Sequence, residues 1–264
     1  MPFLNGPPEV APGLRPIPES KWLVPDTENE EWLPGKRIVM ATRPDETVLG
    51  DVNGLPAREL LSLVGEAVGG SPHHSWETAL EAAASIVSDD LCLLERDTDG
   101  AWVLTAAVVA APTYWWPEDQ LGLSLADLHD PVPGGNPQLA ARINRIFDNL
   151  ASDRVLERFN WTVQAEGTRH TPDRPRADGV APEQLFLRVE RQTIRKLPET
   201  GAICFTIRVC MDPLLPILAD ADLRETFEDA WLGAAPEIRA YKGWDELEPL
   251  VRQACRQSAG APWS

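Results

Sequence analysis

Five segments with strand character constrain the fold of this chain more than any other feature. Two of them read as a hairpin, because residues 91–96 ("LCLLER") and 101–111 ("AWVLTAAVVAA") flank the turn "DTDG". Three more follow in succession at residues 158–166, 185–197 and 202–211. Since consecutive strands usually pair with one another, we expect an antiparallel sheet of five strands.

Helical periodicity appears before, between and after these strands. A helix that begins near residue 75 has Ser75 as its N-cap candidate, and one that follows Asn136 has Pro137 at its first position. An apolar sheet face must be covered, so we expect an α+β fold with the helices on one face. The predicted helices span residues 56–70, 75–90, 137–150, 220–233 and 244–257.

The pattern predicts a single domain over residues 1–264 with three parts. Residues 1–36 contain eight prolines and are expected to form an extended arm, which Trp22 and Trp32 would pack against the body. Residues 90–211 hold the sheet, and residues 212–264 form C-terminal helices. A turn-rich insert at residues 168–184 is expected to be a loop.

Charge and composition exclude several classes of partner. The chain has 24 Lys and Arg against 41 Asp and Glu, so its net charge of −17 repels nucleic acid and anionic membranes. Its start has neither a basic nor an apolar region, so we expect no signal peptide, and it has no apolar run of about 18 residues. Its four cysteines form no CxxC pair, so we expect a cytoplasmic protein with reduced thiols.

The histidines offer the clearest candidate for a cofactor ligand. His129 in "LADLHDPVPG" directly precedes a rigid proline bend, and it fits either a structural hydrogen bond or heme ligation. One histidine cannot define a zinc site, but a single imidazole can hold heme iron. His73 and His74 precede a predicted helix and remain an alternative, whereas His170 is expected to be an exposed loop residue. No phosphate loop, HExxH or GxSxG motif is present.

Polar side chains interrupt the apolar strands at two places. Arg158 and Asn160 lie in "RFNW", and Arg188, Glu190 and Arg191 lie in "LRVERQTIRKLP". Because side chains alternate along a strand, Arg188 and Glu190 point the same way. Such groups form either a solvent-facing sheet surface or the wall of a pocket, where an arginine and a carboxylate can polarise dioxygen and hold an ammonium group.

Several blocks in fixed order resemble one known family. They are "GLRPI", "WLVPD", "LCLLE", "WVLTAAVVAAPTYW", "LGLSLADLHDPVPG", "RFNW" and "LRVERQTIRKLPETGAICFTIRV". Together they resemble the heme-dependent oxidative N-demethylase alpha-subunit-like proteins. The resemblance implies a PAS-like heme-binding fold and the oxidation of a small amine by dioxygen. It further implies electrons from NADPH, delivered by a separate flavin and iron–sulfur reductase chain.

The resemblance also implies roles for individual residues. It favours heme b with His129 as the iron ligand, with His73 or His74 as the alternative. The sequence departs from the family in "AAPTYWWPEDQLG", at Thr113 and Gln120, which leaves the substrate open. A heme-binding PAS-type sensor without turnover is the alternative function. We expect Trp161, Arg191 and Phe147 to contact the heme, and Arg188, Glu190, Arg158 and Asn160 to polarise dioxygen and orient the amine.

Overall fold

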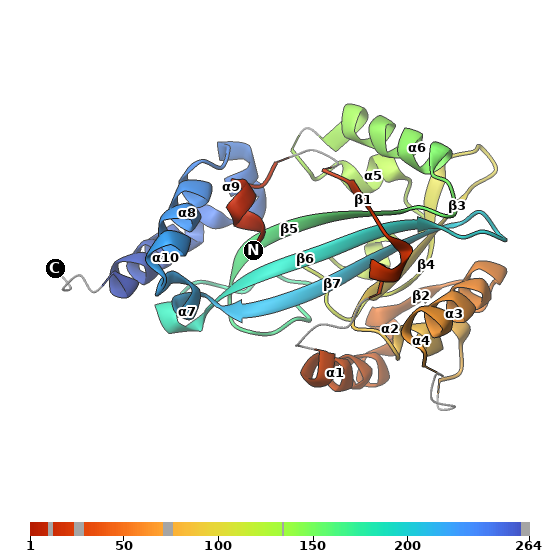
Figure 1. The fold of residues 1–264 in the computed structure, drawn as a ribbon, viewed down its shortest axis with the longest axis horizontal. Helices are drawn as coiled ribbons and strands as arrows, with labels where there is room; N and C mark the ends of the chain where they lie inside the picture. Colours follow the sequence, from red (N-terminus) through yellow and green to blue (C-terminus); the bar gives the residue numbers. More distant parts are fainter. Residues whose placement is uncertain (10–12, 24–28, 71–75, 134, 260–264) are drawn as a thin grey trace.

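The computed structural model is built on one antiparallel sheet of seven strands (Figure 1). It describes residues 1–9, 13–23, 29–70, 76–133 and 135–259. The strand order in the sheet is β1-β5-β6-β7-β3-β4-β2. The strands are β1 Arg15–Ile17, β2 Val48–Gly50, β3 Asp90–Arg96, β4 Trp102–Val108, β5 Val155–Ala165, β6 Leu185–Lys196 and β7 Ile203–Pro213.

The five predicted strands are confirmed as β3 to β7, and they lie next to one another in the sheet. The expected number of strands is wrong, because two short strands cover the edges. β1 pairs with β5, and β2 pairs with β4. Each edge strand has only three residues, which is too short to show an alternating pattern in the sequence. Short edge strands of this kind protect a sheet from pairing with other chains.

The helices form three groups, one before β3, one between β4 and β5, and one after β7. The helix predicted from residue 75 is shorter, since α4 begins after Thr78, whose hydroxyl accepts a hydrogen bond from the Glu81 amide; Ser75 lies outside the described residues. A single π-helical turn at Gly135–Leu139 precedes α6. The helices are α1 Asn29–Thr42, α2 Pro44–Thr47, α3 Leu55–Val68, α4 Ala79–Ala84, α5 Leu125–His129, α6 Ala140–Asn149, α7 Leu214–Leu218, α8 Ala221–Leu232, α9 Pro236–Lys242 and α10 Trp244–Ser258.

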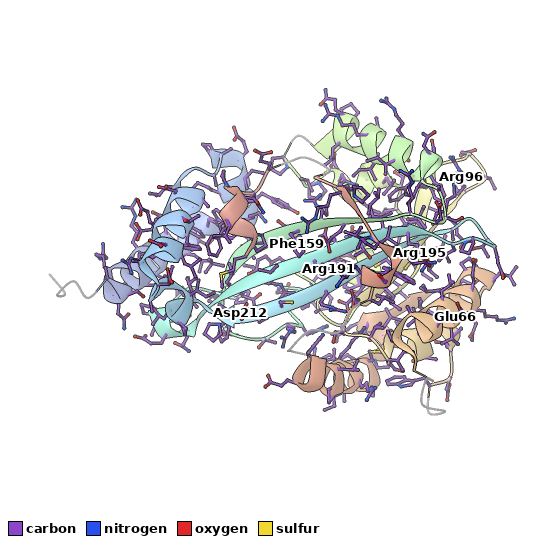
Figure 2. All side chains as sticks on the ribbon, in the orientation of Figure 1. Glu66, Arg96, Phe159, Arg191, Arg195 and Asp212 are labelled. Atoms are coloured by element: carbon purple, nitrogen blue, oxygen red, sulfur yellow. The ribbon has the colours of Figure 1, made fainter. Side chains whose placement is uncertain are left out.

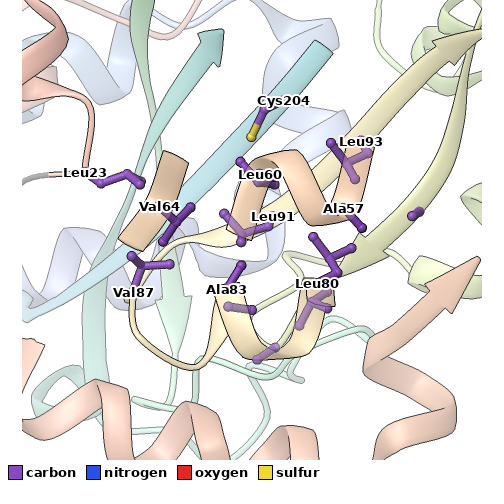
Figure 3. Close-up of a cluster of buried hydrophobic side chains, with 14 of the residues drawn as sticks. Leu23, Ala57, Leu60, Val64, Leu80, Ala83, Val87, Leu91, Leu93 and Cys204 are labelled. Atoms are coloured by element: carbon purple, nitrogen blue, oxygen red, sulfur yellow. The ribbon is translucent and has the colours of Figure 1, made fainter. Parts of the chain in front are cut away.

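Helices cover both faces of the sheet, so the expectation of helices on one face is wrong. On one face, Leu60 of α3 packs in a cluster with Leu91 and Leu93 of β3 (Figure 3). On the other face, Cys92 and Leu94 pack in a cluster with residues of α5 and α6. The unbroken apolar run of β3 explains this arrangement, because a strand that is apolar on both sides must be buried on both sides.

The N-terminal arm is only partly extended. Residues 29–42 form α1, which corrects the prediction for the end of the arm. Trp32, Lys36 and Met40 lie four residues apart and are all buried, but the lysine in the middle of this helical face interrupts its apolar pattern. Trp22 is fully buried, as expected for an arm that packs against the body.

The C-terminal helices pack against the far end of β5 and β6, away from α5 and α6 (Figure 1). Their core is aromatic: Trp231 and Trp244 stack with ring centroids 4.1 Å apart, and Trp244 contacts Trp161 of β5 at 4.9 Å. This packing fixes α9 beside β5. Within the described residues, no helix is long and apolar enough to cross a membrane.

Candidate functional site

Four polar residues form a continuous surface on one face of β5 and β6. Asn160 is paired with Glu190, and Arg158 is paired with Gln192, in the register of the two strands. Paired residues of neighbouring strands project from the same face, and so do residues two apart along a strand. The predicted candidates Arg158, Asn160 and Glu190 are therefore brought together on one face of the sheet.

Glu190 is the buried carboxylate of this surface, with 9% of the residue exposed. It accepts hydrogen bonds from the Thr113 hydroxyl, from Gln192 Nε2 at 2.8 Å and from Asn160 Nδ2 at 3.3 Å. Burial alone would raise the pKa of Glu190, but the charge of Arg188 and these hydrogen bonds outweigh it and lower the pKa. Glu190 is therefore ionised at neutral pH.

Arg188 lies on the same face but is fully buried, with its guanidinium bonded to protein acceptors. Its Nε donates to Thr113 Oγ1 at 2.8 Å, so it fixes the hydroxyl that in turn bonds Glu190. Because its hydrogens are taken up in this way, Arg188 positions the site rather than touching a ligand. The other acceptors are Gln164, Thr171 and the carbonyl oxygens of Ala111, Pro112 and Arg169.

Lys242, at the end of α9, is a residue of the site that the sequence did not reveal. Its Nζ donates to Asn160 Oδ1 at 2.9 Å and to the Trp161 carbonyl at 3.0 Å. The Asn160 amide thus bridges the ammonium of Lys242 and the carboxylate of Glu190. Burial lowers the pKa of Lys242 to about 8, although Glu190 opposes the shift. A lysine before the glycine that ends a helix usually caps it in solvent, so the pattern gave no signal.

His129 ends α5, a helix that starts with a capping box of Ser124 and Asp127. Its Nδ1 donates to the Leu125 carbonyl at 2.7 Å, which fixes the ring and leaves Nε2 as the nitrogen with a lone pair. Burial lowers the pKa of His129, and the charge of Arg158 adds to this effect against the Leu125 hydrogen bond. Among the described residues, Nε2 has no hydrogen-bond partner. A neutral imidazole with a free Nε2 is the form that ligates metals.

A cavity of about 470 Å³ lies between the N-terminal segment at residues 7–9, the bend after α5 and the start of α9. It is lined by Pro133 in the bend after α5, and by Gly233, Ala235 and Ile238 around the start of α9. Its volume is in the range of small-molecule sites. None of the candidate residues around Glu190 lines this cavity, so it lies apart from them.

The comparison with known families identifies one family. A family model described as "Haem-dependent oxidative N-demethylase, alpha subunit-like" matches residues 62–252. The match covers more than half of the chain and includes α5, α9 and strands β3 to β7. The chain belongs to this family. The resemblance seen in the sequence blocks is thereby confirmed.

In this N-demethylase-like chain, two of the expected heme contacts lie on the opposite face of the sheet from Glu190. Trp161 packs among Phe3, Phe227 and Trp244. Arg191, labelled on the sheet in Figure 2, donates to Glu157 Oε1 at 2.7 Å and to the backbone carbonyl oxygens of Lys21 and Trp22. Odd and even positions of a strand face opposite ways, so the structure does not bring these two residues together with His129.

The remaining candidates of the N-demethylase-like chain are placed as follows. Phe147 of α6 lies in the same cluster as α5, packed edge-on against Trp102 at 5.7 Å. His170 is not the exposed residue that we expected, because its side chain is 9% exposed and lies within 3.2 Å of the Ala110 carbonyl and of Glu46. His73 and His74 lie outside the described residues.

The donor set of this family member fits a cofactor that needs one protein ligand. Within the described ranges, no group of three or more His, Cys, Asp and Glu side chains is arranged to hold a metal ion. His129 instead offers a single neutral imidazole on a fixed ring. One proximal imidazole is what heme iron requires.

The low pKa of Lys242 predicts a pH effect on stability. An unfolded lysine keeps its proton up to about pH 10.5, but Lys242 in the folded protein loses its proton above about pH 8. The free energy of unfolding of the wild type therefore increases with pH relative to that of Lys242→Met. We expect a gain of about 1–2 kcal/mol in the free energy of unfolding between about pH 7 and pH 9.5, measured in urea. Lys21→Met, at an exposed position, is the matched control. Wild-type and Lys242→Met stabilities that run parallel with pH would contradict the burial of this ammonium.

Proposed function

We propose that this protein is a heme-dependent oxidase that uses dioxygen to oxidise a small amine, as in oxidative N-demethylation. The observation that carries the proposal is the fixed, neutral imidazole of His129. The charge of Arg158 acts both on this imidazole and on the ionised Glu190 of the sheet surface. The name of the family to which the chain belongs supports the same chemistry.

The residues of the site divide the work between them. His129 Nε2 would hold heme b, and heme supplies the activation of dioxygen for oxidation at the carbon next to the amine nitrogen. Glu190 accepts a hydrogen bond from the ammonium form of the amine and places it by charge. Asn160 and Lys242 hold the Glu190 carboxylate in position, and Arg188 holds Thr113 against it.

Electrons for the reaction come from outside this chain in our proposal. NADPH would supply them through a separate flavin and iron–sulfur reductase. The term "alpha subunit-like" in the family description supports a partner subunit. We place the protein in the cytoplasm on the sequence arguments above.

We also propose that strands β3 to β7 form a PAS-like core. These five strands are consecutive in the sequence and contiguous in the sheet, with β1 and β2 added at its edges. On this proposal, the N-terminal and C-terminal helices are additions that bury the second face and close the site. The contact of Lys242 with Asn160 supports this view, because α9 supplies a group to the sheet surface.

The proposal is tested by oxygen uptake. Purified protein is loaded with heme, reduced chemically, and given secondary amines such as dimethylamine. We expect oxygen consumption that depends on the amine, with release of formaldehyde and the demethylated amine. Reversible binding of dioxygen without consumption for any amine would favour the sensor and overturn the proposed turnover.

Glu190→Gln should separate binding of the amine from binding of heme. The glutamine keeps the shape and the hydrogen bond to Thr113 but removes the charge that attracts the ammonium group. We expect kcat/KM for secondary amines to fall by roughly 100-fold, with the heme absorption spectrum unchanged. Glu157→Gln is the matched control, since Glu157 lies on β5 but faces the other side of the sheet. Equal effects of the two variants would remove Glu190 from the amine site.

A further inference from the structure

We infer that Arg158 is a binding point for a carboxylate. Its side chain is half-buried on β5, and its Nε is shielded from solvent without a hydrogen-bond partner. Across the part of the chain that the structure describes, Arg158 forms no hydrogen bond or ion pair with any residue. A guanidinium N–H that is shielded from solvent and has no acceptor is unfavourable, so we look for the acceptor of Nε outside the described residues.

The charges around Arg158 point to an anion. Arg188 and Glu190 lie on the same face of the sheet as Arg158, and Lys242 reaches this face through Asn160; Glu190 is the one carboxylate among these groups. Asp90 lies near Arg188 as well, but Lys36 compensates it at 3.8 Å. Cations therefore outnumber anions at this surface, in a chain whose net charge is −17.

The position of Arg158 shows which ligand meets it. It lies on the same face of the sheet as Glu190, and its charge reaches both His129 and Lys242. Guanidinium groups bind carboxylates through paired N–H donors, and Nε with a terminal nitrogen forms such a pair. The inference rests on the proposed function only for the source of the carboxylate. Heme brings carboxylates on its propionates, and an N-methyl amino acid brings one as the amine substrate.

The first experiment tests heme as the source. Hemin and hemin dimethyl ester, whose propionates are blocked, are titrated into heme-free wild type, Arg158→Met and Arg158→Lys and followed by absorbance. If a propionate binds Arg158, wild type prefers hemin by about tenfold or more, and Arg158→Met loses this preference. Arg158→Lys keeps the charge and is expected to retain part of it. Arg142→Met, at an exposed position of α6, is the matched control.

The second experiment tests the amine as the source, and it needs no heme. Sarcosine, which carries a carboxylate, and dimethylamine, which does not, are titrated into the heme-free proteins by calorimetry. If the amine brings the carboxylate, Arg158→Met weakens sarcosine binding about tenfold and leaves dimethylamine unchanged. Since Arg158 bonds no described residue, its replacement should leave the fold intact, which circular dichroism checks.

The two experiments also separate this inference from the proposed function. If Arg158→Met matches wild type with all four ligands, the carboxylate site is refuted, while heme binding in both proteins leaves the proposed function standing. If no variant binds hemin, the proposed function fails, and the sarcosine titration still decides the carboxylate site.

Discussion

Replacing Arg188 by methionine is expected to lower the free energy of unfolding by about 3–5 kcal/mol. Arg188 is fully buried and ties Gln164 of β5 to the loops at residues 111–113 and 169–171. Methionine fills a similar volume but donates no hydrogen bond, so several buried carbonyl oxygens lose their partner. A loss of this size is a large part of the stability of a typical domain.

Urea denaturation of the two proteins measures the effect. Arg188→Lys keeps the charge but not the planar set of donors, so it should recover only part of the lost stability. Arg142→Met is the control, because Arg142 is exposed on α6 and makes none of these bonds. A midpoint for Arg188→Met that equals the control would show that these hydrogen bonds do not hold the loops.

The long elements were predictable because their patterns are local. The five strands β3 to β7 each have enough residues to show an apolar run or an alternation, and all five were confirmed. The helix α3 was confirmed too, with Gly69 in the left-handed conformation at its end. The edge strands and α1 were missed for opposite reasons: the first are too short, and the second has a buried lysine in its apolar face.

The sequence of β3 indicated that helices cover both faces of the sheet, but we expected them on one face only. "LCLL" is apolar at every position, and such a run indicates a strand buried on both sides. The alternation of β6 suggested a sheet with one wet face instead. Both patterns are present in one sheet, because β3 is apolar on both sides whereas β5 and β6 carry polar residues on both faces, Glu190 and Asn160 on one and Arg191 and Glu157 on the other.

The sequence could predict only those residues of the candidate site whose position follows from the alternation of side chains along a strand. Parity places Arg158, Asn160 and Glu190 on one face, and it places Arg191 on the other, although we had expected Arg191 at the heme. The contributions of Thr113 and Lys242 come from a loop and from α9, which are remote in sequence from β6. Such contacts depend on how the chain returns to the sheet, and no local pattern encodes that return.

The largest effect on function is expected from His129→Ala. Of the two histidines that the structure describes, His129 is the one whose Nε2 has no hydrogen-bond partner. Alanine at this position leaves no ligand for the iron. We expect heme affinity to fall by at least about 100-fold, because loss of a metal's protein ligand exceeds the 10-fold to 100-fold cost of losing a residue that only orients it. The fold should persist, since the ring makes one hydrogen bond, to a carbonyl of its own helix.

Two further variants separate His129 from the other histidines. His170→Ala is the matched control, because both ring nitrogens of that side chain are already engaged, by the Ala110 carbonyl and by Glu46. A His73→Ala, His74→Ala double variant tests the alternative ligand. Both proteins should bind heme as the wild type does. Loss of heme in the double variant with normal binding in His129→Ala would move the ligand to the segment before α4.

The Soret band of these proteins, recorded with and without free imidazole, tests the role of His129 most directly. Wild type should show the spectrum of histidine-ligated heme, and His129→Ala should lose it and regain it when imidazole enters the space that the side chain leaves. An unchanged Soret band in His129→Ala without imidazole, or the absence of heme binding by well-folded wild type, would contradict a heme site built on this residue.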